Sequence, residues 1–251
     1  MIEIKNLTKS FGNLLVWEDV SFKIEEGETI AIIGKSGCGK SVLIKHINAL
    51  MAPDSGKVLI DGQDIHEMDY VSKRKLRQKF GILFQGSALF DSINTFENVA
   101  FPLRYFSHQT EEEIRKNVME ALGHVNLEDA YDKETSELSG GMRKRVGLAR
   151  AMVLTPEYIM YDEPTSGLDP QTSQEINELI IEMANTLDIT SIVVTHDMHS
   201  VLKVADKVAF LDQQKLSWHG TVDEMRDSNH KELIDFITAS EYQIKNRVKY
   251  N

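Results

Sequence analysis

The chain has 251 residues, enough for one large domain with a sizeable buried core, and 41% of them are hydrophobic. Its 39 acidic residues outnumber its 28 lysines and arginines, and the resulting net charge of -11 argues against nucleic acid as a partner. The sequence contains no apolar run of about 18 residues, so no membrane-spanning helix is predicted. Residues 1–5 show no secretory signal pattern and Cys38 is the single cysteine, which together favour a reducing, cytoplasmic location.

The first part of the chain alternates apolar and polar side chains, as strands do when one face is buried. The five residues Thr29–Ile33 form an apolar run that ends at Gly34, which is typical of a buried strand. A helix is expected next, because Leu43, Ile44 and Ile47 recur on one helical face. The predicted strands of this part cover residues 2–5, 20–25, 29–33 and 57–60, and the helix covers residues 41–50.

Helix signals dominate the middle of the chain, from Gln85 to about Thr155. Thr110 precedes three glutamates, a pattern typical of a capped helix start with acidic residues in its first turn. Ser139 predicts the start of another helix, which runs to about Leu154. Further strands are predicted over residues 80–84, 158–161, 189–195, 208–211 and 215–218, the last two as a hairpin around residues 213–214. The pattern therefore predicts a helical segment inserted into an α/β core.

Residues 34–41 read Gly-Lys-Ser-Gly-Cys-Gly-Lys-Ser and lie between a predicted strand and a predicted helix. Backbone N–H groups of such a glycine-rich loop surround the phosphates of a nucleotide. Lys40 then reaches the β- and γ-phosphates, and Ser41 binds Mg²⁺. The alternative is an ordinary glycine turn, which the strand before the loop and the helix after it disfavour. We interpret Cys38 as a small residue in a crowded loop rather than as a redox switch.

Polar side chains follow three further predicted strands, at the edge where open α/β sheets bind their ligands. Asp162 and Glu163 come directly after an apolar strand, so Asp162 is predicted to hold Mg²⁺ and Glu163 to act as the general base. His196 follows another strand and is predicted to orient the attacking water at the γ-phosphate. Gln85 also ends a strand and is predicted to contact Mg²⁺ or that water. Taken alone, each of these residues also suits an ordinary solvated or structural role.

Residues 139–141, Ser-Gly-Gly, offer a hydroxyl and exposed backbone N–H groups at a helix start, which makes a second place for an anion. The alternative interpretation is a simple N-cap followed by flexible glycines. The basic residues 143–145 follow at once, either as a solvated face or as a source of positive potential near a bound anion. Phe11 lies in an N-terminal turn, and its ring is either a platform for a base or part of the core.

The order of these motifs resembles that of the ATPase subunits of ABC transporters, from Ile2 to about Met225. The motifs are the phosphate loop, Gln85, Leu138-Ser139-Gly140-Gly141, the strand leading to Asp162-Glu163, Ser166-Gly167-Leu168-Asp169 and His196. The resemblance implies an α/β fold of the P-loop NTPase class, with a RecA-like core, an antiparallel β subdomain and an inserted α-helical subdomain. The implied single ATPase domain divides into a core at residues 1–86 and 156–230, a helical subdomain at 87–155 and a C-terminal extension at 231–251.

The family also implies that two copies of the chain sandwich two ATP molecules, each with Mg²⁺, in a head-to-tail dimer. The residues facing the ATP of the other copy are Ser139, Gly140, Gly141 and Met142, and Asp169 is implied to lie across the dimer interface. The implied ATP-binding residues are Phe11, which stacks on adenine, and Gly34, Lys35, Ser36, Gly37, Cys38, Gly39, Lys40, Ser41 and Val42. The implied Mg²⁺ ligands are Ser41, Gln85 and Asp162, and the catalytic residues are Glu163, His196 and Gln85. The family's usual glutamine is replaced by Met142, so no polar role is expected there.

Two stretches are similar to the ATPase subunits of Mce/Mla-type lipid transporters: LSGGMRKRVGLARA at residues 138–151 and FQGSALFDSINTFENVAFPLR at residues 84–104. This similarity implies ATP-driven phospholipid transport through an integral-membrane permease that docks near Gly86–Asn98. An Mce-domain protein and a small regulatory subunit are implied as further partners. The chain is then peripheral on the inner face of the cell membrane. The sequence does not decide whether residues 231–251 contact the second subunit or a regulatory partner.

Three alternatives stay open. The same ATPase could energise an importer of a small polar solute, such as an amino acid. A soluble ABC protein that acts on ribosomes or DNA is a second class, but such proteins carry two cassettes or a long coiled-coil insertion, and this sequence has neither. The third is a regulatory module that binds nucleotide without turnover, against which the predicted catalytic residues argue.

Overall fold

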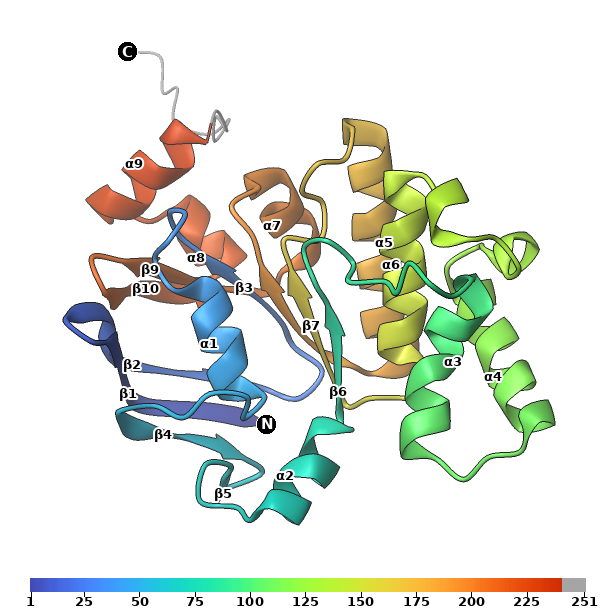
Figure 1. Ribbon diagram of the computed structural model, residues 1–251. Coiled ribbons are helices and arrows are strands. Elements are labelled where there is room, and N and C mark those ends of the chain that lie inside the picture. The colour runs from blue at the N-terminus through green and yellow to red at the C-terminus, as the bar shows by residue number, and fades with distance from the viewer. Residues whose placement is uncertain (241–251) are drawn as a thin grey trace. The chain divides into compact units, whose positions relative to one another are not determined.

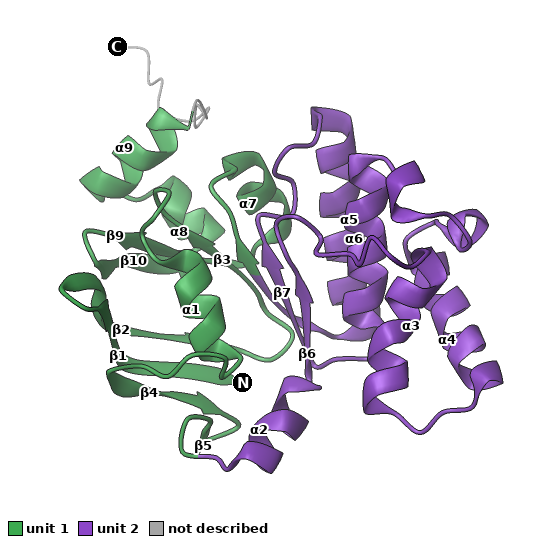
Figure 2. Cartoon of the chain, in the orientation of Figure 1, with its two compact units in different colours: residues 1–67, 193–251 green, residues 68–192 purple. Residues whose placement is uncertain are grey.

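The computed structural model describes residues 1–240 (Figure 1). The chain divides into two compact units. The first comprises residues 1–67 and the chain from residue 193 onward, and the second comprises residues 68–192 (Figure 2). The predicted helical subdomain, residues 87–155, lies within the second unit, and its limits stay a prediction. Residues 241–251 of the predicted extension lie outside the described residues. Among residues 1–240, no helix combines the length and the apolar character needed to cross a membrane.

An antiparallel sheet of four strands, in the order β2-β1-β4-β5, forms part of the first unit. Ile2 of β1 pairs with Ile24 of β2 on one side and with Ile60 of β4 on the other. These isoleucines are buried, so the predicted alternation is confirmed, although both of the first two strands extend beyond their predicted limits. The strands are β1 (Ile2–Phe11), β2 (Leu14–Ile24), β4 (Ser55–Ile60) and β5 (Gln63–Asp64).

Three further strands of the first unit lie side by side, with β3 parallel to β9 and with β9 and β10 forming an antiparallel hairpin. Gln213 and Gln214 turn this hairpin with φ of 46° and 64°, the backbone twist that tight two-residue turns require. The predicted hairpin is therefore confirmed. The strands are β3 (Thr29–Ile33), β9 (Lys207–Asp212) and β10 (Lys215–Thr221).

The helices of the first unit within the described residues are α1 (Lys40–Ile47), α7 (Met198–Val204), α8 (Val222–Arg226) and α9 (Lys231–Ala239). Helix α9 buries Leu233, Phe236 and Ile237, which share one helical face, in a core with Phe210 of β9. The ring centroids of Phe210 and Phe236 are 5.2 Å apart. The beginning of the predicted C-terminal extension is thus an integral part of the first unit.

The second unit contains two parallel strands, β6 (Phe80–Leu83) and β7 (Tyr158–Asp162), in a register that sets Leu83 beside Tyr161. Its helices are α2 (Tyr70–Arg77), α3 (Thr95–Phe106), α4 (Glu111–His124), α5 (Gly140–Met152) and α6 (Pro170–Leu187). Helix α5 lies against β6, where Gly81 approaches the backbone of Ala151 too closely for any side chain. The buried strand β8 (Thr190–Val194) carries the chain from the second unit into the first.

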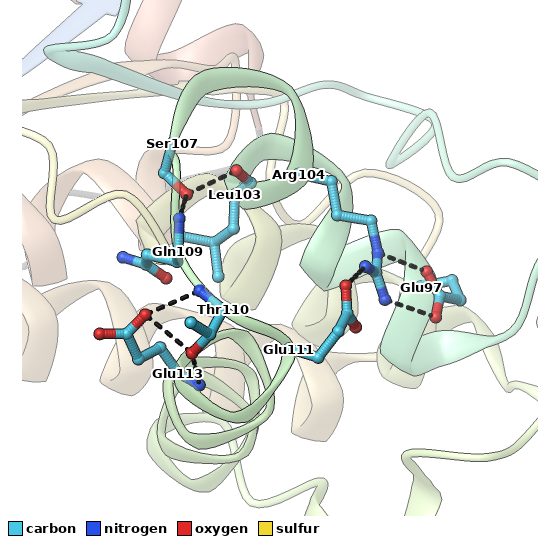
Figure 3. Close-up of polar contacts among 8 residues, drawn as sticks. All are labelled: Glu97, Leu103, Arg104, Ser107, Gln109, Thr110, Glu111 and Glu113. Carbon is cyan, nitrogen blue, oxygen red and sulfur yellow. Dashed lines mark hydrogen bonds and ion pairs between the residues drawn. The ribbon is translucent and has the colours of Figure 1, made fainter.

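Polar side chains fasten the connection between α3 and α4 (Figure 3). Thr110 Oγ1 accepts the N–H of Glu113 at 3.3 Å, and the Glu113 carboxylate accepts the N–H of Thr110 at 2.7 Å, so the predicted capped start is confirmed. Arg104 of α3 donates to both carboxylate oxygens of Glu97, at 3.0 and 3.1 Å, and also pairs with Glu111 in α4. Exposed ion pairs add little to the free energy of unfolding, so the main effect of these contacts is to orient the segment that connects α3 and α4.

Candidate functional site

The phosphate loop begins where the buried strand β3 ends, as predicted. Gly34 has φ of 151° and lies against the backbone oxygen of Leu211 and the sulfur of Cys38, so no side chain fits at this position. At Gly37, by contrast, an added Cβ would meet nothing within 4 Å. The loop is therefore tight where it leaves the strand and open at its tip, which leaves room for a ligand.

Helix α1 begins at this loop without a side-chain cap. Its N-cap residue is Gly39, with φ of 95°, and no side chain caps the helix start. Every other α-helix described within residues 1–240 begins with a capping side chain. The N–H groups and the positive end of the helix dipole at an uncapped start attract an anion. The local structure thus fits the phosphates of a nucleotide.

Lys40 closes the loop with a buried ammonium group, since the residue is only 8% exposed. Its Nζ donates to the carbonyl oxygens of Gly34, at 2.9 Å, and Lys35, at 3.2 Å, which holds the charge over the loop. Burial raises the pKa of the Cys38 thiol, and a protonated thiol is the less reactive form. That direction favours the interpretation of Cys38 as a small loop residue over a redox switch.

His196 lies in the first unit, next to the strand that leads into the phosphate loop. Thr195, directly before it, donates its N–H to the carbonyl of Ile32 in β3 at 3.3 Å. The histidine itself is exposed. Phe11, at the end of β1, has an exposed ring, 46% accessible, with Lys9 Nζ at 5.5 Å from its centroid. An exposed ring suits base stacking and excludes the alternative that Phe11 belongs to the core.

The acidic pair lies in the second unit, at the end of β7. Asp162 is the last residue of this strand, and Glu163 follows with φ of 50°, a left-handed conformation that costs a non-glycine residue about 1 kcal/mol. Gln85 follows the neighbouring parallel strand β6, and its Nε2 lies 3.5 Å from Ser166 Oγ. The predicted positions after strands β6 and β7 are confirmed for Gln85 and Glu163, whereas β7 extends one residue further than predicted and includes Asp162.

Lys144 is a member of this group that the sequence pattern did not single out. It is 4% exposed, and its Nζ donates to the carbonyl oxygens of Gln85, at 2.6 Å, and Glu163, at 3.1 Å. Burial lowers the pKa of this ammonium, while the nearby carboxylates act in the opposite direction. A solvated face is therefore the wrong interpretation for Lys144. Its position, one turn before the buried Leu148 on the same helical face, was the available signal.

The start of α5 combines capping with close packing. Ser139 Oγ accepts the N–H of Met142 at 3.2 Å, which matches the N-cap interpretation. Gly140 is exposed, whereas Gly141 is buried, and a Cβ on Gly141 would lie 2.5 Å from Thr172 Cγ2. Gly141 is therefore required for close contact with α6, and the exposed backbone predicted for residues 140–141 is found at Gly140 and not at Gly141.

Asp169 joins this arrangement as the N-cap of α6. Its Oδ1 accepts the N–H groups of Gln171 and Thr172, both at 3.0 Å, and its Oδ2 accepts the Thr172 hydroxyl at 2.6 Å. These hydrogen bonds, led by the Thr172 side chain, hold the pKa of the Asp169 carboxyl below its usual value. Thr172 thus lies against Gly141 and bonds to Asp169, so it links the start of α5 to the N-cap of α6.

Replacement of Gly141 by Ala should lower the free energy of unfolding by about 1–3 kcal/mol, because the new methyl group overlaps Thr172. Urea denaturation of the purified chain measures this change. Thr172→Ser removes only the methyl group and keeps the hydroxyl bonded to Asp169. The double variant should therefore recover most of the loss. If Gly141→Ala unfolds like the parent chain, the close contact does not exist.

The predicted Mg²⁺ ligands are of the oxygen type that this ion prefers. Among residues 1–240, no three His, Cys, Asp or Glu side chains are grouped so as to hold a metal by themselves. Mg²⁺ in nucleotide sites usually takes one or two protein ligands beside phosphate oxygens and water, so the predicted set does not require such a group. The assignment of Ser41, Gln85 and Asp162 stays a prediction.

Three relatives are similar to this chain over most of its length. The probable ribonucleotide transport ATP-binding protein mkl of Mycobacterium leprae is 43% identical, over 95% of this chain and 69% of that protein. The intermembrane phospholipid transport system ATP-binding protein MlaF of Haemophilus influenzae is 40% identical, over 94% of this chain and 90% of that protein. The methionine import ATP-binding protein MetN of Carboxydothermus hydrogenoformans is 41% identical, over 90% of this chain and 67% of that protein.

The fold is similar to that of the dimeric ATP-binding cassette MJ0796 bound to ADP and Pi, with a TM-score of 0.81. The two chains are 31% identical, over 88% of this chain and 99% of that one. This similarity confirms the predicted fold class, and the match to MlaF confirms the resemblance to Mce/Mla-type ATPases. The ABC transporter family model matches residues 17–166. The chain therefore belongs to the ABC transporter family, as an ATP-binding subunit.

Proposed function

We propose that the chain hydrolyses ATP to energise phospholipid transport through an integral-membrane permease. The observation that carries the ATPase part is the phosphate loop, where an uncapped helix start lies beside the buried ammonium of Lys40. The lipid part is supported by the similarity to MlaF, which is named for intermembrane phospholipid transport and which the chain covers almost completely.

Each candidate residue is proposed to have a specific role in ATP binding or ATP hydrolysis. Backbone N–H groups of residues 34–42 bind the phosphates, and Phe11 stacks on adenine. Bound Mg²⁺ would supply positive charge at the β- and γ-phosphates, and Ser41, Gln85 and Asp162 are its proposed ligands. The Glu163 carboxylate takes a proton from the attacking water, and His196 orients that water.

Two copies of the chain are proposed to act together. The relative MJ0796 is described as dimeric, and its 31% identity to this chain supports the same arrangement here. In that arrangement Ser139 and Gly141 of one copy face the ATP bound by the other, and Asp169 lies at the interface. The fifth residue of the motif, Met142, contributes no polar group to the nucleotide.

Permease docking near Gly86–Asn98 is supported by a group of exposed aromatic rings in the second unit. The rings of Phe90 and Phe101 have centroids 4.8 Å apart, and the rings of Phe101 and Tyr105 stack at 6.3 Å. All three side chains are more than 40% exposed, an unusual state for large apolar groups. A permease segment that covers them would place the chain at the inner face of the cell membrane, in the cytoplasm.

The names of the relatives also support the alternative of a polar substrate, since mkl is named for ribonucleotide transport and MetN for methionine import. The test is to isolate the complex from membranes of the native cell through a tag on this chain and to identify its subunits. A permease with an Mce-domain protein and a small regulatory subunit would support the proposal. A permease with a soluble solute receptor would contradict the lipid part, and no membrane protein at all would indicate a non-transport ABC protein.

A further inference from the structure

Lys144 of α5 connects two segments of the second unit that are far apart in the sequence. Its Nζ donates to the backbone oxygens of Gln85 and Glu163, at 2.6 and 3.1 Å, from a position that is almost fully buried. Because both acceptors are carbonyl groups, this ammonium fixes the main chain at two points. A buried charge is unfavourable unless hydrogen bonds compensate it, and an apolar side chain would fill the same space without that penalty.

Both connected segments have irregular backbones that depend on outside support. Glu163 has φ of 50°, and Ser87 and Ala88 have φ of 60° and 47°, in a region that side chains disfavour. Helix α5 supplies a second cation here, because Arg150 donates to the carbonyl oxygens of Ser87 and Ala88 at 2.6 and 2.7 Å. The same helix thus holds both irregular segments through buried or half-buried positive charges.

We propose that Lys144 is a positioning residue for ATP hydrolysis, whose ammonium holds the main chain of Gln85 and Glu163 in one fixed geometry. The inference rests on the proposed function, in which Glu163 is the general base. In this role Lys144 needs no contact with the nucleotide or the water, because it acts through the backbone of the two residues. A displacement of a reacting group by about 1 Å lowers rates on the order of 100-fold, so such a tie has a measurable effect.

The position of Lys144 within α5 gives its hydrogen bonds to Gln85 and Glu163 a second consequence. Ser139 caps this helix and, in the proposed dimer, faces the ATP of the other copy. A helix transmits a shift of its first turn to the next turn, where Lys144 lies, because its backbone hydrogen bonds join consecutive turns. Contact with one ATP molecule is thereby passed to the general base that serves the other.

The experiment compares three variants of the full chain in its permease complex. Lys144→Met keeps the length and apolar stem of the side chain but removes the donors, and Lys144→Arg keeps the charge and several donors. Lys116→Met is the matched control, because Lys116 is exposed on α4. The measurements are kcat and KM for ATP, the dissociation constant of ATP, the melting temperature, and amide hydrogen exchange over residues 83–90 and 161–168.

Lys144→Met should lower kcat at least about tenfold, while KM and the ATP dissociation constant stay within about threefold, because the phosphate loop is untouched. The melting temperature should stay within a few degrees, because a methionine fills the same buried space. Amide exchange should accelerate over residues 83–90 and 161–168, and Lys144→Arg should recover most of the lost kcat. The control Lys116→Met should resemble the parent chain in every measurement.

Three results would overturn the inference. One is a Lys144→Met variant with kcat within about twofold of the parent value. Another is a parallel loss of kcat, ATP affinity and melting temperature, which would indicate a general structural role. The third is a Lys144→Arg variant no better than Lys144→Met. Failure of the proposed function gives a different result, because the parent complex itself would then not hydrolyse ATP. In that case amide exchange would still show whether Lys144 holds residues 83–90 and 161–168 in place.

Discussion

Replacement of Glu163 by Gln is expected to lower the rate of ATP hydrolysis at least about 100-fold and to leave ATP bound. The amide has the size of the carboxylate but cannot take the proton of the attacking water. The phosphate loop and Lys40 are unchanged, so the ATP dissociation constant should stay close to the parent value. With hydrolysis blocked, ATP should hold two copies together as a closed dimer. Phosphate release measures the first effect, and size-exclusion chromatography in the presence of ATP measures the second.

The matched control for this change is Glu157→Gln, which neutralises a carboxylate just before the same strand. Glu157 pairs with Lys79 in an exposed position, so its loss should change hydrolysis less than about twofold. A Glu163→Gln variant that hydrolyses ATP near the parent rate would show that the base is assigned to the wrong residue.

Replacement of Lys40 by Met is expected to weaken ATP binding about 100-fold, which corresponds to roughly 3 kcal/mol. The change removes the charged hydrogen bonds to the phosphates. It also removes the donor that joins the carbonyls of Gly34 and Lys35, so the loop loses part of its shape. Isothermal titration calorimetry with ATP measures the dissociation constant.

Lys45→Met serves as the control for Lys40, since Lys45 is an exposed lysine on the same helix. Its affinity for ATP should match that of the parent chain. Equal affinities of the Lys40 and Lys45 variants would mean that Lys40 does not contact the phosphates.

Local features were the most predictable part of the fold. The strand Thr29–Ile33 was predicted with its observed limits, because a short apolar run that ends at a glycine is typical of a buried strand. The caps at Thr110 and Ser139 were also predicted, since each depends on residues within one turn. Helix α9 was not predicted. Its apolar face packs against Phe210 of β9, and this long-range contact cannot be recognised from the local sequence.

In the candidate site, too, local features could be predicted from the sequence and long-range contacts could not. Gln85, Glu163 and the phosphate loop could be named from residue type and order alone. The contact of Gly141 with Thr172 could not, because it joins two helices whose relative placement no local pattern encodes. Lys144 was hidden for a related reason: a lysine between two arginines has the composition of a solvated surface, and its burial depends on the two backbone carbonyls that receive it.

The uncapped start of α1 gives the proposed nucleotide a structural role in addition to its role as substrate. When phosphates accept the N–H groups at Gly39 and the residues that follow, they complete a helix that the polypeptide leaves unfinished. The empty chain should therefore fray first at this point, where proteases and amide exchange detect it, and ligand binding should raise the apparent stability with concentration. Nucleotide added during purification should therefore stabilise the fold, whether or not the nucleotide is hydrolysed.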